Sequence, residues 1–349
     1  RLFFFNHAHN EYLQLLAEAG LLVAPPAVNA GLTGAVLMAR RRTAYRAPAF
    51  RAPAGAPRGR LPPGHGQPDD EAMGTGGKTG QDAASGAVVS RVTCTLGEEG
   101  EILLPGLEHL AADQTDGLGQ HRIGELADAM QALGVTDHRF LGGAGRYRDS
   151  GMMGTLQNDR TDCFWQADVT VAVADLVRVI RELRPQVLVT YDENGGYGHP
   201  DHIQANRVAT TARDRAAQGA YAPELGEPWQ IAKLYHSAIP KSVLQAGIDH
   251  LRDSGASDFF GVESAEDLPF GVADEVITTE VDAREHLDAK VGAMRAHATQ
   301  IAVDGPFFAL SNNVGQKAFG IEYYVLVDGA RGPGDGPLGR EYDLFGGLD

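Results

Sequence analysis

The sequence has few cysteines and few basic residues, and each shortage disfavours a class of protein. Its 349 residues include two cysteines, Cys94 and Cys163, with no Cys-x-x-Cys spacing. A disulfide framework and a thiolate zinc site are therefore disfavoured, and a reducing cytoplasm is the expected location. Only 30 Lys and Arg stand against 46 Asp and Glu, which gives a formal net charge of -16. Such a surface would repel phosphates and anionic membranes, so we expect no nucleic-acid partner.

Long uncharged runs are also scarce, and the most prominent one covers residues 19–39, just before three consecutive arginines. This run has the length and the positive flank of a membrane-spanning helix. Pro25, Pro26 and Asn29 weaken that interpretation. We therefore expect no membrane attachment, with residues 19–39 as the weak candidate for one.

The first 60 residues differ in composition from the rest of the chain. Residues 44–63 are mostly Ala, Pro, Gly and Arg, with almost nothing to bury. The segment Asn6 to Gln14 resembles a loop motif of membrane O-antigen ligases, so residues 1–40 are interpreted as a fragment of such a protein. We predict that residues 1–60 are an extension and linker outside the fold, that residues 61–349 form one domain, and that residues 1–58 are dispensable.

From residue 87 onward the pattern alternates between strand and helix. Residues 88–95 are rich in β-forming residues, and apolar residues then recur at helical spacing up to Leu133, before Gly134. A second amphipathic pattern covers Val169 to Leu183 and stops at Pro185, before a strand over residues 187–191. This order predicts an α/β, Rossmann-like, largely parallel sheet with flanking helices.

Two further elements are expected towards the C-terminus, a helix over residues 282–301 and a closing strand over residues 323–327. In a wound sheet of this kind, ligands bind beyond the carboxyl ends of the strands.

The strand over residues 187–191 leads into a polar, Gly-rich loop that ends at His202. His199 and His202 are three residues apart, with Pro200 between them at a plausible helix start. Both imidazoles can therefore face one cavity. Two histidines at this edge of the sheet indicate a metal-binding or acid/base role.

A second polar cluster is Gln67-Pro68-Asp69-Asp70-Glu71. Adjacent aspartates can divide two tasks, since one carboxylate can bind a divalent ion while the other accepts a proton. Such an ion, held by carboxylate and imidazole with one position open, lowers the pKa of bound water towards about 7. Pairing with the histidine loop favours this interpretation over a solvated helix start.

Four motifs in order carry a resemblance to a known family. They are Pro68-Asp69-Asp70-Glu71, Val92 to Glu101, Gly195 to His202, and Ala296-His297-Ala298-Thr299-Gln300. Together they resemble the LmbE-like (PIG-L) zinc deacetylases over about residues 60–328. Within that family they look most like the branch that removes acetate from N-acetylglucosaminyl-inositol in mycothiol biosynthesis. The mycothiol S-conjugate amidases of the same family are the alternative.

The resemblance implies one Zn²⁺ ion, with Fe²⁺ as a second option, and a small amino-sugar inositol substrate. It assigns Asp70 and His202 as metal ligands and Asp69 as the general base. His199 would be a protonated partner that stabilises the oxyanion or protonates the leaving amine, and Tyr197 would hydrogen-bond the tetrahedral intermediate.

Two further residues match substrate-binding positions of the family, Arg122 and Asp149. An exposed guanidinium and a carboxylate suit the recognition of a polyol. Each could instead form a surface ion pair of little energetic weight.

The sequence departs from the family at the third metal ligand. The family has a histidine immediately before Pro-Asp-Asp, and this chain has Gln67. A neutral glutamine oxygen should hold zinc less tightly than an imidazole, and His65 could substitute for it. A sugar-binding pseudoenzyme that has lost turnover therefore stays open as an alternative function.

The segment before Gln67 departs from the family as well. Residues 61–66 contain two prolines and two glycines where a central strand should run. Either this copy has decayed, or the local structure is rebuilt from elsewhere in the chain. Gly77-Lys78-Thr79 looks like the end of a phosphate-binding loop, but Ala72 replaces its first glycine and no strand precedes it, which disfavours an NTPase.

Overall fold

A computed structural model describes residues 34–40, 70–253, 263–268, 270–300, 320–334 and 338–348 of the protein. A seven-stranded sheet has the order β3-β2-β1-β4-β5-β7-β6. The strands are β1 (Gly34–Arg40), β2 (Ala87–Thr93), β3 (Asp137–Phe140), β4 (Val187–Thr190), β5 (Lys233–Ala238), β6 (Thr279–Asp282) and β7 (Ile321–Asp328). The α-helices are α2 (Asp70–Ala84), α3 (Leu118–Leu133), α4 (Val169–Leu183), α5 (Gly195–Gly198), α6 (Pro200–Ala216), α7 (Lys241–Asp253) and α8 (Leu287–Ala296).

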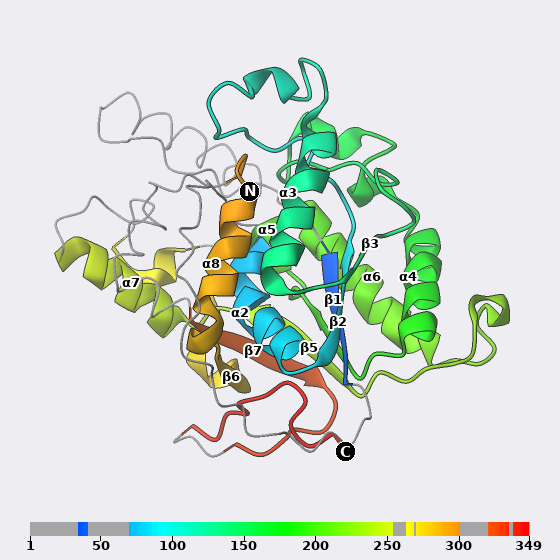
Figure 1. The fold of residues 1–349 in the computed structure, drawn as a ribbon, viewed down its shortest axis with the longest axis vertical. Helices are drawn as coiled ribbons and strands as arrows, with labels where there is room; N and C mark the ends of the chain where they lie inside the picture. Colours follow the sequence, from blue (N-terminus) through cyan, green and yellow to red (C-terminus); the bar gives the residue numbers. More distant parts are fainter. Residues whose placement is uncertain are drawn as a thin grey trace, which may run out of the picture.

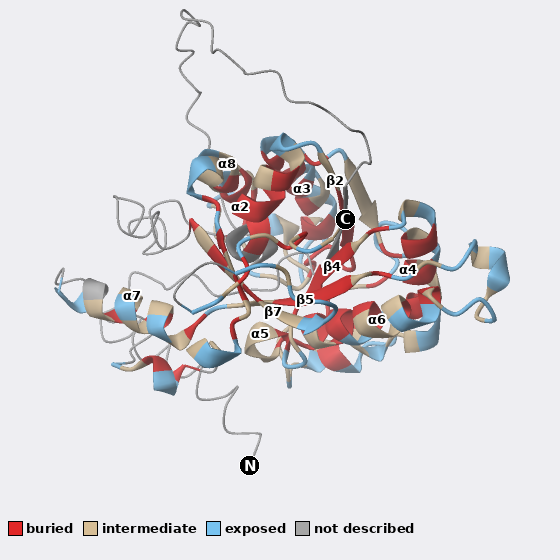
Figure 2. Cartoon of the chain, turned by 90° about the horizontal axis from the view of Figure 1, so that it is seen from below, coloured by how far each residue is buried: buried red, intermediate tan, exposed pale blue. Residues whose placement is uncertain are grey.

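Helices cover both faces of this sheet (Figure 1). Helices α2, α3 and α8 pack together on one face, whereas α4 and α6 pack together on the other. Successive residues of β4 point to opposite faces, so Val187 and Val189 join one core while Leu188 joins the other. The sheet between the two groups of helices is largely buried (Figure 2).

The predicted α/β architecture is confirmed, and most strands share one direction. Strands β2 and β3 are parallel, and so are β4 and β5. Strand β1 is antiparallel to both β2 and β4, and β7 is antiparallel to both β5 and β6. It follows that β2, β3, β4, β5 and β6 all run the same way, with β1 and β7 reversed. The carboxyl ends of β4 and β5 therefore lie at one edge of the sheet.

Strand β1 corrects the expectation that residues 1–60 lie outside the fold. Its backbone pairs with β2 from Gly34 to Arg40 and with β4 from Val36 to Met38. Buried N–H and C=O groups of β2 and β4 need partners, and this proline-free segment can supply them. Residues 61–66, whose sequence disfavours a strand, lie outside the described residues, as do residues 1–33 and 41–60.

The weak candidate for a membrane span, residues 19–39, overlaps with β1. Within the described part of the chain, none of the helices is long and apolar enough to cross a membrane. Residues 34–39 of the uncharged run belong to β1 instead of a helix.

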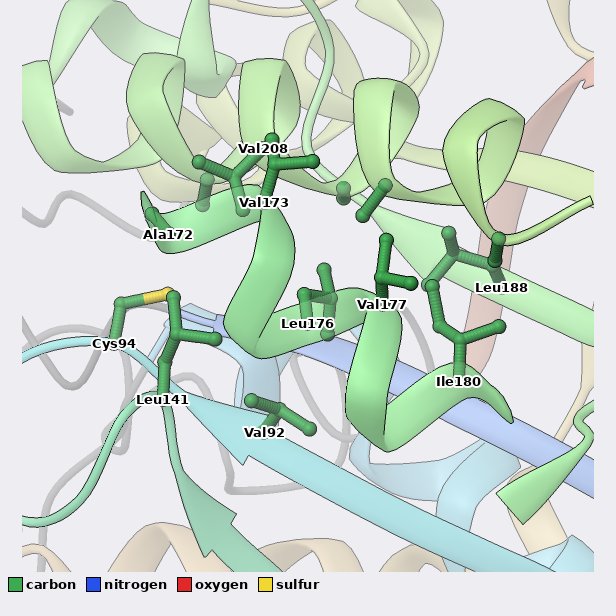
Figure 3. Packing of buried hydrophobic residues seen from close by; sticks show 14 of the residues in the cluster. Val92, Cys94, Leu141, Ala172, Val173, Leu176, Val177, Ile180, Leu188 and Val208 are labelled. Carbon is green, nitrogen blue, oxygen red and sulfur yellow. The ribbon is translucent and has the colours of Figure 1, made fainter. Parts of the chain in front are cut away.

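The two amphipathic helices predicted from apolar spacing are confirmed. Helix α4 begins at its N-cap Asp168, whose carboxylate accepts from the Thr170 N–H at 2.8 Å, and it ends before Pro185. Its buried positions include Val173, Val177 and Ile180, which point into the core shared with α6 (Figure 3). Helix α3 ends at Gly134, which is left-handed with φ of 72°, as the sequence predicts for a C-terminal cap.

Helix α2 contains several glycines, and a carboxylate from β7 contacts its backbone. Glu322 accepts from the N–H groups of Gly77 and Lys78 at 2.7 and 2.8 Å, and from Lys290 Nζ at 2.7 Å. Lys78 Nζ in turn donates to Asp82 and Asp343, both at 2.7 Å. The groups that a phosphate would need are thus engaged by carboxylates, which argues against the NTPase alternative.

The C-terminal prediction is correct in order, but the helix is shorter than residues 282–301 at both ends, since it already ends at Ala296. Helix α8 begins at Leu287 instead of residue 282, because Thr279–Asp282 pairs with β7 as strand β6. The predicted closing strand is β7, which extends the expected range at both ends.

Candidate active site

The histidine loop lies at the carboxyl edge of β4, where the sheet topology places ligands. Strand β4 ends at Thr190, and the chain then passes through the short helix α5 into α6. His199 is the N-cap of α6 and Pro200 is its first residue, so His202 lies in the first turn. The rings of His199 and His202 have centroids 4.9 Å apart. The two imidazoles that the sequence predicted to face one cavity therefore lie next to each other.

His202 is held on two sides. Its Nδ1 lies 3.1 Å from the carbonyl oxygen of Gly195, and its ring stacks on Tyr191 with centroids 4.1 Å apart and an interplanar angle of 9°. Gly195 has φ of 66°, and a Cβ there would lie 2.7 Å from the Cβ of His202, so glycine is required. Burial lowers the pKa of His202 to about 3, so the imidazole is neutral. A carbonyl at Nδ1 fixes the proton there and makes Nε2 the nitrogen suited to a metal.

His199 has the opposite tautomer. Its Nδ1 accepts from the backbone N–H of Asp201 at 3.1 Å, so in the neutral ring the proton is on Nε2. The side chain is completely buried, and Nε2 has no hydrogen-bond partner among the described residues. Burial lowers the pKa of His199 well below its usual value. A permanently protonated His199 is therefore disfavoured, and a neutral N–H donor takes its place.

Two buried carboxyl groups lie beside this histidine. Asp201 accepts from the N–H of Ser150 at 3.0 Å and from its hydroxyl group. Asp149 accepts from the N–H of Gly151 at 2.9 Å. Burial raises the pKa of Asp149 to about 6, with a contribution from Glu98, and burial together with Asp149 raises that of Asp201 well above its usual range. Two adjacent carboxyl groups with raised pKa values tend to share one proton or to bind a neighbouring cation.

Asp149, His199 and Asp201 form a group that could hold a metal ion, since one potential ligand atom from each lies within 4.8 Å of the others. The tautomer of His199 counts against the group as the main metal site. Its Nδ1 is engaged by the Asp201 N–H, and its Nε2 carries the proton. His202, whose Nδ1 faces a carbonyl, is the better imidazole ligand.

Tyr197 is half-buried in α5 and faces both histidines. Its ring lies edge-on to His202, with centroids 5.1 Å apart, and 6.3 Å from that of His199. The structure thus brings together three of the residues that the sequence predicted for the site.

Arg122 does not have the exposed guanidinium that the sequence led us to expect. The side chain is completely buried. It donates to Thr299 Oγ1 at 3.1 Å, to the carbonyl oxygen of Glu101 at 3.0 Å and to that of Gly97. The reason for the difference is long-range, because the segment around Thr299 closes over α3. The guanidinium of Arg122 therefore links the loop after β2 to the segment that follows α8.

Three predicted residues, His65, Gln67 and Asp69, lie outside the described residues. Asp70 is the first residue of α2. Helix α2 packs against β2 and connects to it by a short turn, so its N-terminus lies towards the carboxyl end of β2. Since β2 and β4 run the same way, this is also the edge that carries His199 and His202.

Sequence reasoning missed the roles of Asp201, Ser150 and Glu98. Asp201 stands between the two histidines, and this position was the available signal for it. Ser150 is 51 residues from its partner Asp201, and Glu98 accepts from the Asp149 N–H at 3.0 Å across a similar separation. Nothing local in the sequence indicates these pairs.

Comparison with known proteins gives consistent results. The family described as GlcNAc-PI de-N-acetylase (PIG-L) matches residues 66–213. A 1D-myo-inositol 2-acetamido-2-deoxy-alpha-D-glucopyranoside deacetylase of Geodermatophilus obscurus is 59% identical over 285 residues, which cover 81% of this chain and 96% of the relative. The protein of that name from Acidothermus cellulolyticus is 58% identical over 287 residues, covering 82% and 94%.

Among solved structures, an N,N'-diacetylchitobiose deacetylase from Pyrococcus horikoshii matches with a TM-score of 0.49 and 17% identity. The match covers 75% of this chain and 80% of that one. None of these comparisons supports the resemblance of residues 1–40 to an O-antigen ligase.

The site thus combines buried histidines and carboxylates at the carboxyl edge of an α/β sheet. The identity of 58–59% over most of both chains shows the family. The chain belongs to the PIG-L family of N-deacetylases.

Proposed function

We propose that this protein hydrolyses the N-acetyl group of N-acetylglucosaminyl-inositol, as a step of mycothiol biosynthesis. Relatives with 58–59% identity bear the name of a deacetylase of this compound, and they are matched over most of their length. The acetamide of the substrate reacts with water to give a free amine and acetate. The expected cytoplasmic location stays a prediction that rests on the cysteine content.

The observation that carries the proposal is the buried N–H of His199. A buried donor without a partner costs about 1–3 kcal/mol, so proteins rarely retain one without a use. Here the proton is fixed on Nε2 by the Asp201 N–H, close to His202. A carbonyl oxygen of the substrate, which gains negative charge during hydrolysis, would complete this donor.

The residues also suit a divalent metal. We propose that His202, Asp70 and Gln67 bind it, with His65 as the possible substitute for Gln67. The set of imidazole, carboxylate and amide oxygen fits Zn²⁺ and Fe²⁺, and Nδ1 of His202 already faces a carbonyl. When bound, such an ion would polarise the amide carbonyl and make water more acidic.

The chain's own groups then divide the remaining work. Asp69 accepts the proton of the attacking water and can return it to the leaving amine. The Nε2–H of His199 stabilises the oxyanion as a neutral donor, and the hydroxyl group of Tyr197 assists it.

Substrate binding is proposed for the carboxyl group of Asp149, which lies beside Asp201 and can bind a sugar hydroxyl group. For Arg122, the buried bonds to Gly97, Glu101 and Thr299 support an indirect role. We propose that it holds the loop over residues 97–101, whose Glu99 N–H donates to Asp149 at 3.3 Å.

The test compares two substrates of the family. Purified full-length protein is incubated with N-acetylglucosaminyl-inositol or with a mycothiol S-conjugate, and free amine and acetate are measured. We expect acetate and amine in equal amounts from the first substrate and little cleavage of the second. Faster cleavage of the conjugate would favour the amidase alternative, and binding without any product would favour the pseudoenzyme.

A further inference from the structure

Helix α6 is joined to the ends of two strands by one side-chain amide. Asn206 lies one turn after His202 on α6 and is buried. Its Nδ2 donates to the carbonyl oxygen of Tyr191, just beyond β4, at 2.8 Å. The same nitrogen lies 3.1 Å from Nε2 of His236 on β5. Since an amide nitrogen only donates, Nε2 of His236 is the acceptor, and the two protons of Nδ2 are both used.

His236 is placed for this task by the pairing of the strands. It is opposite Thr190 in the parallel register of β4 and β5, and it is buried. Its other nitrogen, Nδ1, is 3.9 Å from the carboxylate of Glu193 at the exposed start of the histidine loop. Burial lowers the pKa of His236, against the charges of Glu193 and Asp192, which keeps Nε2 available as an acceptor.

The link reaches the site through Tyr191. Asn206 fixes the backbone of Tyr191, and the ring of Tyr191 stacks on His202. Asn206 and His202 are also four residues apart on one helix, so they lie on the same face. A shift of Asn206 would therefore move the imidazole of His202 both through α6 and through the stacked ring.

We propose that Asn206 and His236 are positioning residues that orient the imidazole of His202 for metal binding. This inference rests on the proposed function, in which His202 binds the metal. Partners beyond the ligands commonly fix the direction of a ligating imidazole, and their loss typically lowers metal affinity 10- to 100-fold. A role in stability alone would leave the affinity of the folded protein unchanged.

The test uses the full chain and four variants. His236→Phe keeps a ring but removes the acceptor, His236→Gln keeps an acceptor, and Asn206→Ala removes the donor. Ser90→Ala is the matched control, since it removes a hydrogen bond of 2.6 Å to Asp137 between β2 and β3, which is not part of the site. Zn²⁺ affinity is measured by competition with a chromophoric chelator, together with melting temperature, kcat and KM.

We expect His236→Phe and Asn206→Ala to weaken Zn²⁺ binding about 10- to 100-fold and to lower kcat with little change in KM. His236→Gln should recover most of the affinity, because it keeps an acceptor for Asn206. Ser90→Ala should lower only the melting temperature.

Unchanged Zn²⁺ affinity in folded His236→Phe and Asn206→Ala would overturn the inference. A loss that His236→Gln does not recover would also overturn it, because the effect would then not depend on the acceptor. The ligand assignment is tested separately by His202→Ala. If that variant binds Zn²⁺ as tightly as the wild type, the proposed metal site itself is wrong.

Discussion

At the scale of single residues, the tautomers of the two site histidines lead to different roles. Nδ1 of His199 accepts from an N–H group, whereas Nδ1 of His202 faces a carbonyl oxygen. The first ring therefore presents an N–H group at Nε2, and the second presents a lone pair. One backbone turn thus places a hydrogen-bond donor beside the imidazole that we propose as a metal ligand.

Replacing His199 by Ala should lower kcat by about 10²- to 10³-fold, because a pre-oriented donor to the oxyanion is lost. Metal content should stay at the wild-type value, since Nε2 of His199 carries a proton and is no ligand. Steady-state kinetics and metal analysis of the same preparation check both statements. Loss of the metal in this variant would instead favour the group of Asp149, His199 and Asp201 as the metal site.

Substitution of the proposed metal ligand and of the proposed general base should have different effects. His202→Ala should abolish metal binding, whereas Asp69→Ala should keep the metal and lower turnover by about 10²- to 10⁴-fold. Metal content by atomic emission and acetate release are the measurements. Equal metal content in the wild type and His202→Ala would contradict the ligand assignment.

Gln67 decides between an enzyme and a pseudoenzyme. Gln67→His should restore an imidazole ligand and raise Zn²⁺ affinity about tenfold or more, with a faster deacetylation rate. If the wild type already binds zinc stoichiometrically and the variant changes nothing, His65 or another group is the third ligand. A variant that gains zinc but stays inactive would support the pseudoenzyme.

At the scale of elements, β1 is the feature that most changes the account drawn from sequence. It lies between β2 and β4 and pairs with both, so it connects the parallel pair β2–β3 to the parallel pair β4–β5. Strand β4 leads directly into the histidine loop. The position of β1 therefore affects both the stability of the sheet and the position of the site.

Removing residues 1–41 should strongly destabilise the protein compared with removing residues 1–32, because only the first deletion removes β1. Leu37→Pro should also destabilise the protein, in comparison with the control variant Leu37→Val. Leu37 is opposite Ser90 and Leu188, and each backbone acceptor left without a donor costs about 1–3 kcal/mol. Urea denaturation measures the effect. Equal stability of the two truncated chains would support the original prediction that residues 1–58 are dispensable.

At the scale of the whole molecule, stability should fall in mild acid, in part because of His138 on β3. Burial, with the charge of Arg91, lowers the pKa of this half-buried histidine to about 4, against 6.5 for a free side chain. Between these pH values the unfolded chain binds a proton that the folded protein does not. The free energy of unfolding should therefore fall as the pH decreases from 6.5 to 4, with no further contribution below that range.

Urea denaturation at pH 7 and pH 5 tests this effect. His138→Gln should show a smaller loss of stability between the two pH values than the wild type. His109→Gln, which alters an exposed histidine, is the control and should behave like the wild type. An identical pH dependence for wild type and His138→Gln would refute the prediction.

How much of this molecule could be predicted depends on the range of the interactions. Helices α3 and α4 follow from apolar spacing and local caps, and the histidine loop follows from its place after a buried strand. Strand β1 could not be predicted, because its partners Val92 and Val189 are remote in sequence and its direction is opposite to theirs. The burial of Arg122 depends on Thr299, 177 residues away, so its helix alone suggested an exposed side chain.

The central claim is that this chain is a metal-dependent deacetylase despite Gln67. Its most direct test is a titration of metal-free protein with Zn²⁺ or Fe²⁺, with acetate release from N-acetylglucosaminyl-inositol measured at each step. Activity should rise from near zero and reach a plateau at one ion per chain. Activity that is independent of added metal, or a fully loaded protein that binds the substrate and releases no acetate, would contradict it.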